Sequence, residues 1–283
     1  MEHYGQRVRS ALAALEDAEY ILIGGGSGLS AAAGLDYSGP RFTENFADFI
    51  EKYGLTDMYS ASFYPFPTQE ELWAHWARHI AVNRFDQGAT ELYQRLLELV
   101  DGMGKEYFVI TTNVESQFEK AGFPRSRIFE VQGNYAYLQC AAGCHDRLYY
   151  DEEIVRRMLA RTRDCRIPSE LIPTCPVCGG PMDVNLRKDG NFVQDDAWYE
   201  AEGHYRAFLR RAAKGRLVLL ELGVGFNTPG IIRYPFEQLT YQNPQATLIR
   251  VNRDYPQAMR ENCARTIPFD EDMGDVVSAL GKR

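Results

Sequence analysis

The sequence predicts an α/β protein with a mostly parallel sheet, and two observations carry that prediction. Short apolar runs rich in β-branched and aromatic residues alternate with segments whose apolar residues recur at helical spacing. Continuous apolar runs of this length are typical of strands buried on both faces, as in parallel sheets. The runs cover residues 20–23, 107–110, 128–131, 217–220 and 247–251.

The first of these runs leads directly into a glycine-rich turn. Gly24-Gly25-Gly26-Ser27-Gly28 follows it, and the Ala-rich segment 30–33 predicts a helix after the turn. Such a strand–turn–helix lets backbone N–H groups approach a pyrophosphate closely. Glycine-rich strand ends also occur in flavin, nucleoside and purely structural turns, so the turn alone leaves those alternatives open. A dehydrogenase would carry a second strand about 20 residues on, ending in an acid; this region looks helical, which argues against hydride transfer.

Two stretches interrupt the alternation. Residues 42–100 look helical almost throughout, with Thr68-Gln69-Glu70-Glu71 as a capping box. Residues 136–190 contain cysteine pairs and several prolines. We therefore expect a Rossmann-like sheet with helices on both faces, plus a smaller helical and zinc-binding domain. The expected ranges are 1–41, 101–135 and 205–283 for the Rossmann-like domain, 42–100 for the helical insertion, and 136–204 for the zinc-binding insertion.

Composition narrows the function classes. A net charge of -8 argues against a general nucleic-acid binder, whose affinity comes from basic groups that neutralise phosphates. No apolar run approaches 18 residues, so we expect no membrane span. Residues 1–7 lack the basic and apolar regions of a secretion signal, so we expect a cytoplasmic protein.

Four of the six cysteines form two sequence pairs, Cys140-x3-Cys144 and Cys175-x2-Cys178. Thiolates at these spacings can share one tetrahedral Zn²⁺ ion, and Cys175-Pro-Val-Cys-Gly-Gly has the form of a zinc knuckle. The alternative is two unrelated buried pairs, since a free cysteine packs as a small apolar residue. A four-sulfur site has no open coordination position, so this zinc would stabilise the fold. His145 is a possible substitute for Cys144, although the thiolate is the better ligand.

Four segments resemble sirtuin motifs, in the family's order and spacing. Residues 26–37 are similar to the signature that begins Gly-Ala-Gly-x-Ser, and residues 111–115 to Thr-Gln-Asn-Ile-Asp. Residues 223–227 resemble a divergent Gly-Thr-Ser loop, and residues 251–254 the Ile-Asn segment that holds the adenosine ribose. The resemblance implies NAD as the cofactor. The residues that it implies contact NAD are Gly26, Ser27, Gly28, Ser30, Asp36, Tyr37, Thr112, Asn113, Glu115, Gln132, Gly223, Val224, Gly225, Asn227, Asn252 and Arg253.

The chain departs from the deacetylating sirtuins at their catalytic base. Those enzymes carry a histidine before a glycine, where this sequence has Gln132-Gly133. An amide can orient a hydroxyl but cannot accept a proton near neutral pH. The family's proline is also missing beside Asp36, and Phe118 stands where a second histidine is usual. What remains is the machinery that breaks the nicotinamide glycosidic bond, which passes through an oxocarbenium-like transition state.

This pattern is most similar to the macrodomain-linked, or class M, sirtuins, because residues 34–39, the Gln-Gly pair and Asn185-Leu186-Arg187 resemble theirs. The resemblance implies a protein mono-ADP-ribosyltransferase that modifies a lipoylated, glycine-cleavage-H-like carrier and is functionally linked to a macrodomain hydrolase. Asn113, Gln132 and Arg187 are the predicted catalytic residues; Arg187 could bind an acidic acceptor or a phosphate. The alternatives are an NAD-dependent protein-lysine deacylase and a catalytically inactive NAD-binding scaffold.

Overall fold

The computed structural model describes residues 3–282, which divide into two compact units. The first unit comprises residues 3–34, 89–132 and 197–282, and the second comprises 35–88 and 133–196. None of the helices in the described part of the chain is both long and apolar enough to cross a membrane.

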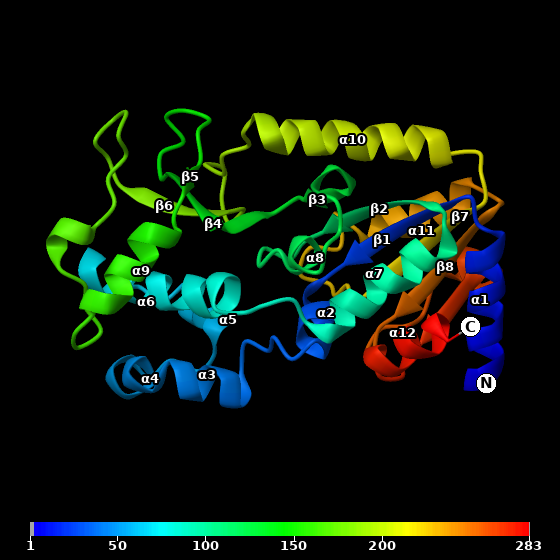
Figure 1. Ribbon diagram of the computed structural model, residues 1–283, viewed down its shortest axis with the longest axis horizontal. Helices are drawn as coiled ribbons and strands as arrows, with labels where there is room; N and C mark the ends of the chain where they lie inside the picture. Colours follow the sequence, from blue (N-terminus) through cyan, green and yellow to red (C-terminus); the bar gives the residue numbers. More distant parts are fainter. Residues whose placement is uncertain (1–2, 283) are drawn as a thin grey trace. The chain divides into compact units, whose positions relative to one another are not determined.

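A six-stranded parallel sheet forms the centre of the first unit (Figure 1). Its order is β3-β2-β1-β7-β8-β9, and all neighbouring strands are parallel. The chain adds β2 and β3 on one side of β1 and then β7, β8 and β9 on the other side, so the strand order reverses between β1 and β7. The strands are β1 (Tyr20–Gly25), β2 (Glu106–Thr111), β3 (Ile128–Glu130), β7 (Leu217–Leu222), β8 (Ala246–Val251) and β9 (Thr266–Phe269). All five predicted strands are confirmed. The sixth, β9, lies at the sheet edge, where Pro268 costs no ladder hydrogen bond on the open side.

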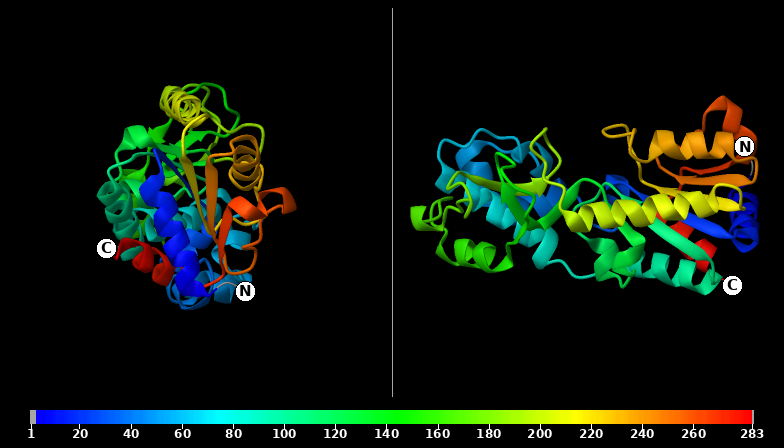
Figure 2. Two further views of the ribbon diagram at one scale, coloured as in Figure 1. Left: turned by 90° about the vertical axis from the view of Figure 1, so that its right-hand side faces the viewer. Right: turned by 90° about the horizontal axis from the view of Figure 1, so that it is seen from above.

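Alternating side chains of each strand enter two separate cores, because a pleated strand points successive residues to opposite faces. Ile21 and Ile23 pack in one core with the buried faces of α1, α7 and α12. Leu22 packs in the other with Phe208 of α10 and Phe236 of α11. Figure 2 shows α1 and α12 on one side of the sheet and α11 on the other. Each such side chain contributes about 1.5–3 kcal/mol by its burial, so the sheet is fixed from both faces as predicted.

The helical segments of the first unit connect these strands. They are α1 (Tyr4–Asp17), α2 (Ser27–Ala32), α7 (Glu91–Met103), α8 (Gln117–Lys120), η2 (Arg125–Arg127), α10 (Asp196–Ala212), α11 (Arg233–Gln242), η4 (Arg260–Arg265) and α12 (Met273–Gly281).

The second unit combines helices with a small antiparallel sheet of order β5-β4-β6. Its strands are β4 (Gly133–Cys140), β5 (Tyr149–Tyr150) and β6 (Met182–Leu186). Its helical segments are α3 (Gly39–Asn45), α4 (Ala47–Tyr53), α5 (Met58–Ala61), α6 (Gln69–Ile80), η1 (Ala81–Phe85), α9 (Glu152–Arg161) and η3 (Ser169–Leu171). Thr68 caps the start of α6 as predicted, because its Oγ1 accepts from Glu71 N at 3.3 Å. The Glu71 carboxylate accepts from the Thr68 hydroxyl at 2.9 Å, whereas a full capping box would use the Thr68 backbone N–H.

Helix α6 carries a buried histidine inside an aromatic cluster. The ring of His75 lies 5.1 Å from that of Phe66, 5.6 Å from Phe46 and 5.7 Å from Phe49. Neither His75 nitrogen has a hydrogen-bond partner among the described residues. Burial, together with a smaller effect of the neighbouring Arg78 charge, lowers the pKa of His75 to about 3. The ring is a neutral member of the core.

Candidate functional site

Two glycine turns meet where the sheet order reverses. Gly28 N donates to Gly223 O at 2.9 Å, which joins the turn after β1 to the turn after β7. A Cβ at Gly28 would lie 2.8 Å from Gly223 Cα, and one at Gly223 would lie 2.3 Å from Leu29 N. Gly223 also has a φ of +62°, which disfavours any side chain. The carboxyl edge of a parallel sheet at such a reversal is where nucleotides bind, because bare backbone can approach a pyrophosphate there. The turns therefore fit a dinucleotide.

The predicted residues near these turns differ in exposure. Ser27 and Asn227 are exposed, and Gly225 has open space around its α-carbon. Thr112 is half-buried, and its backbone N–H donates to Gly25 O at 3.1 Å. Exposed side chains beside closely packed glycines leave polar groups available at the edge of the sheet.

Asn113 lies at the centre of a buried polar cluster after β2. Its backbone N–H donates to Thr111 Oγ1 at 3.0 Å, and Thr111 Oγ1 in turn donates to Gly25 O at 2.9 Å. The side-chain Nδ2 donates to Gly26 O at 2.9 Å and to Ser30 Oγ at 2.9 Å. Because a carbonyl oxygen only accepts, the contact with Gly26 O fixes which end of the amide is nitrogen. The contacts of the Asn113 side chain with the described residues are all made by Nδ2, so Oδ1 is available as an acceptor.

Glu115 completes the cluster from the following turn. Ser30 Oγ donates to Glu115 Oε1, and Val114 N donates to Glu115 Oε2 at 3.1 Å. Burial raises the pKa of Glu115 above its usual range. The next residue, Ser116, has a φ of 59°, a left-handed conformation uncommon outside glycine. The predicted residues Ser30, Asn113 and Glu115 are thus brought together.

Tyr93 of α7 is a member of this cluster that the sequence analysis missed. Its hydroxyl lies 3.0 Å from Ser30 Oγ and 3.3 Å from Asn113 Nδ2, and the side chain is fully buried. In the sequence Tyr93 is one of several apolar positions at helical spacing, which gives no signal of a polar role.

Gln132 follows β3 at the same carboxyl edge of the sheet. Its Nε2 donates to Thr228 Oγ1 at 3.2 Å, in the segment after the second glycine turn. The contact with Thr228 was not predicted, and it leaves the amide oxygen of Gln132 as an acceptor.

The loop after β8 contains Asn252 and Arg253. Asn252 Nδ2 donates to Val224 O at 2.9 Å, and its Oδ1 accepts from Tyr255 N at 2.9 Å. Asn252 therefore ties this loop to the second glycine turn, whereas Arg253 is exposed.

A buried ion network lies beside the second glycine turn and the loop after β8. Arg250 donates to both carboxylate oxygens of Glu221, at 2.7 and 2.9 Å, and to Glu237 at 2.7 Å. Arg233 donates to Tyr255 O at 2.9 Å, and its guanidinium lies 4.6 Å from the centre of the Phe226 ring. The network was not predicted, and it holds the two loops on a rigid base.

The predicted residues Asp36 and Tyr37 belong to the second unit. Arg41 Nη1 donates to Asp36 O at 3.1 Å and to Asn83 Oδ1 at 2.9 Å, which anchors their loop to η1. The Tyr37 hydroxyl lies 3.2 Å from that of Tyr135. The Asp36 side chain is exposed.

Arg187 also belongs to the second unit and directly follows β6. Its guanidinium lies 4.5 Å from the centre of the Phe192 ring, and burial lowers its pKa from the usual value. Gln139 joins the two ends of the segment that contains Arg187 and Phe192. Its Oε1 accepts from Asn185 Nδ2 at 2.9 Å and from Val193 N at 3.0 Å. The stacked guanidinium keeps its charge and its fork of donors.

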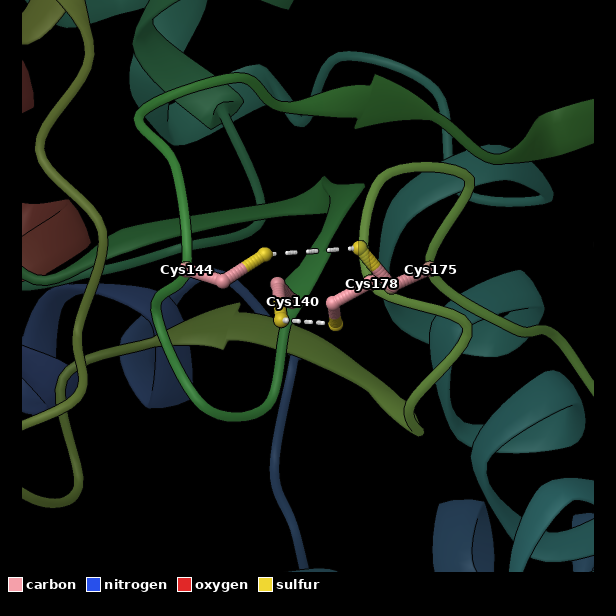
Figure 3. Close-up of side chains that lie close together, drawn as sticks. All are labelled: Cys140, Cys144, Cys175 and Cys178. Atoms are coloured by element: carbon pink, nitrogen blue, oxygen red, sulfur yellow. Dashed lines mark hydrogen bonds between the residues drawn. The ribbon is translucent and has the colours of Figure 1, made fainter.

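The four paired cysteines come together in one cluster (Figure 3). The sulfur–sulfur distance is 3.7 Å for Cys140 and Cys178 and 3.7 Å for Cys144 and Cys175, and all four sulfurs lie within 4.8 Å of one another. Tetrahedral zinc with bonds of about 2.3 Å separates its sulfurs by about 3.8 Å. The donor set therefore fits zinc, and among the described residues it is the one group with metal-ligand composition and spacing.

The surroundings of the cluster support a thiolate site. Hydrogen bonding from the Cys144 backbone N–H lowers the pKa of Cys140 to about 6. Cys175 N donates to Gly180 O at 2.7 Å, which forms the expected knuckle, and Gly179 has a φ of +72°. His145 Nδ1 lies 3.0 Å from the Cys144 sulfur, and its Nε2 lies 2.8 Å from the Tyr149 hydroxyl. His145 thus contacts a ligand sulfur while Cys144 completes the four-sulfur set.

Comparisons with known proteins agree with this architecture. A curated relative from Staphylococcus aureus, named protein ADP-ribosyltransferase, is 38% identical over 269 residues, 94% of this chain and 84% of that protein. A relative from Fusarium oxysporum f. sp. cubense, named probable bifunctional ADP-ribose hydrolase/ADP-ribosyltransferase, is 35% identical over 255 residues, 87% of this chain. This chain spans 42% of the length of the Fusarium protein. No protein-family model matches.

Solved structures of Sir2 homologues share the fold. A complex with ADP-ribose has a TM-score of 0.60 and 14% identity, with 96% of this chain and 94% of that chain covered. A complex with NAD has a TM-score of 0.59 and 15% identity, with 96% and 92% covered.

Proposed function

Because this chain belongs to the sirtuin family, we propose that it is an NAD-dependent protein ADP-ribosyltransferase that releases nicotinamide. The observation that carries the proposal is the bond of Gln132 to Thr228, at the position that the sirtuin resemblance gives to the deacetylases' histidine. An amide cannot remove the ribose proton that deacylation requires. Direct capture of the sugar carbon by a protein acceptor needs no such base, which favours transfer over deacylation.

The residues of the site would act mainly by orientation. NAD supplies a glycosidic bond that breaks with oxocarbenium character. Asn113 Oδ1, with its amide nitrogen held by Gly26 O and Ser30 Oγ, would accept a hydrogen bond from the ribose or the nicotinamide amide. Gln132 would orient a ribose hydroxyl through its amide oxygen. Such orientation lowers the activation barrier because less entropy is lost in reaching the transition state.

The loops on the first unit would hold the rest of the dinucleotide. We propose that Gly26, Ser27, Gly28 and Gly223 to Gly225 contact the pyrophosphate, and that Asn227, Asn252 and Arg253 contact the adenosine half. Close backbone contact between the two turns supports this assignment. We propose that Asp36 and Tyr37 contact the nicotinamide half, and that Arg187 binds the acceptor or a phosphate through its fork of donors.

The substrate proposed for transfer is a lipoylated, glycine-cleavage-H-like carrier protein. The similarity to class M sirtuins in residues 34–39 and 185–187 supports this substrate. The hydrolase named together with a transferase in the Fusarium relative supports a functional link to an ADP-ribose hydrolase. A macrodomain hydrolase would remove the modification.

Intact-mass analysis of the carrier after incubation with the protein and NAD tests this proposal. We expect a gain of one ADP-ribose unit on lipoylated carrier, no gain on unlipoylated carrier, and loss of the gain in Gln132→Ala, Asn113→Ala and Arg187→Ala. Exposed Gln245→Ala is the matched control and should behave as the wild type. NAD-dependent removal of an acyl group from a lysine peptide, without a mass gain on either carrier, would instead assign the protein to the deacylases. Absence of both reactions and of nicotinamide release would favour an inactive scaffold.

A further inference from the structure

We propose that Tyr93 is a positioning residue for nicotinamide release, acting on Asn113 both through Ser30 and through its own contact with the amide nitrogen. The inference rests on the proposed function, because it concerns the same site. Tyr93 lies on α7, outside every motif that resembles the family, and it does not itself reach the open oxygen of Asn113.

Counting donors and acceptors shows why the Tyr93 hydroxyl matters. The Ser30 hydroxyl has one proton and two lone pairs. Its proton goes to Glu115 Oε1, and one lone pair accepts from Asn113 Nδ2. The Tyr93 hydroxyl, 3.0 Å away, occupies the second lone pair. Ser30 therefore has no unused capacity, and its hydroxyl has one orientation.

That orientation determines how Asn113 presents its oxygen. The Asn113 amide nitrogen has two protons, one directed at Gly26 O and the other at the Ser30–Tyr93 pair. Both protons are thereby turned inward, and the planar amide presents Oδ1 at its other edge. The side chains of Ser30, Tyr93, Asn113 and Glu115 are all at least nine-tenths buried, so water does not readily replace a lost partner.

Tyr93→Phe removes one oxygen and keeps the ring that packs on Phe118, whose centre lies 4.9 Å away. We expect kcat for nicotinamide release to fall about tenfold, the usual effect of one buried hydrogen bond. The dissociation constant for NAD, measured by calorimetry, should change less than about threefold because the adenosine half is held by other loops. Tyr107→Phe is the matched control. Tyr107 is buried in the same core as Tyr93 but lies at the start of β2, whereas Asn113 follows the end of that strand.

Two readouts separate positioning from a structural role. In a double-mutant cycle with Ser30→Ala, Tyr93→Phe should cause a smaller further loss than it causes in the wild type, because both hydroxyls act on the same amide. Losses that multiply, or a Tyr93→Phe enzyme with wild-type kcat, would overturn the proposal. So would losses that match those of Tyr107→Phe and follow melting temperature alone.

The second readout does not need turnover. The side-chain amide signals of Asn113, identified by their disappearance in Asn113→Ala, should shift and exchange faster with solvent in Tyr93→Phe. Unchanged signals would refute positioning. A wild-type protein that releases no nicotinamide would refute the proposed function instead, and the amide signals would still decide the role of Tyr93.

Discussion

Replacing Arg250 by methionine tests how far the buried ion network stabilises the nucleotide-binding unit. Arg250 and Glu221 are completely buried, and Glu237 is almost so. Methionine fills much of the arginine's aliphatic volume but leaves two buried carboxylates. The one arginine that remains beside them in the described network is Arg233, 3.3 Å from Glu221.

The expected cost follows from that imbalance. Removing one partner of a buried ion pair destabilises a protein by about 3–5 kcal/mol. A domain of this size loses about 2–4 °C of melting temperature for each kcal/mol, so the variant should melt on the order of 10 °C lower. Arg206 is the control, since its pair with Glu202 lies on the surface of α10 and Arg206 is 65% exposed. Arg206→Met should cost at most about 0.5 kcal/mol.

Thermal unfolding by circular dichroism at pH 7.5, with urea titrations of the same variants, measures these differences. The double variant Arg250→Met/Glu221→Leu should regain part of the loss, because an apolar pair can replace a buried ion pair at little cost. A single variant that loses less than about 1 kcal/mol would refute the reasoning. Equal losses in the single and double variants would also refute it.

Three further predictions concern other parts of the chain. Purified protein should contain about one zinc per chain by plasma mass spectrometry. The Cys175→Ser variant should lose the zinc and melt at a lower temperature, whereas the exposed Cys263→Ser variant should retain it. Zinc retained in Cys175→Ser would contradict the four-sulfur site. The buried neutral His75 has a pKa of about 3. The stability that it contributes is therefore present above the unfolded pKa of about 6.5 and falls by about 1.4 kcal/mol per pH unit below that value. The His75→Phe variant should melt at more similar temperatures at pH 5 and pH 7.5, and an unchanged acid sensitivity would exclude His75 as its source. Gly223→Ala should weaken NAD binding at least tenfold by calorimetry, because its Cβ would lie 2.3 Å from Leu29 N. Gly230→Ala is the control and should bind NAD normally, since Gly230 has open space around it. Equal NAD affinities of the two variants would argue against the contact of the two turns.

The sequence predicted the sheet well because each central strand is a continuous apolar run that packs on both faces. It was less informative about β9, whose four residues include a proline, and about β5, which is two residues long. The antiparallel β4 was hidden by its mixture of polar and aromatic residues. Short strands at edges depend on their neighbours more than on their own pattern.

The site was predictable where a residue type is required by backbone geometry or ligand chemistry. The glycines of the two turns and the four cysteines belong to that class. Tyr93 and Arg233 do not, since their roles depend on which residues the fold brings beside them. A charged residue inside the apolar run 247–251 was a usable signal: Arg250 in a buried strand requires a buried acid, and Glu221, which directly follows the run 217–220, satisfies that need.

The backbone contact between Gly28 and Gly223 limits how this protein could be redesigned for another dinucleotide. A library that randomises both turns should return glycine at these two positions whatever ligand is selected, because a single added carbon at either one meets the other turn's backbone. Exposed positions such as Ser27 and Phe226 have no such restriction and are where altered specificity can be sought. Segments nearly 200 residues apart in the sequence would thus evolve as one part.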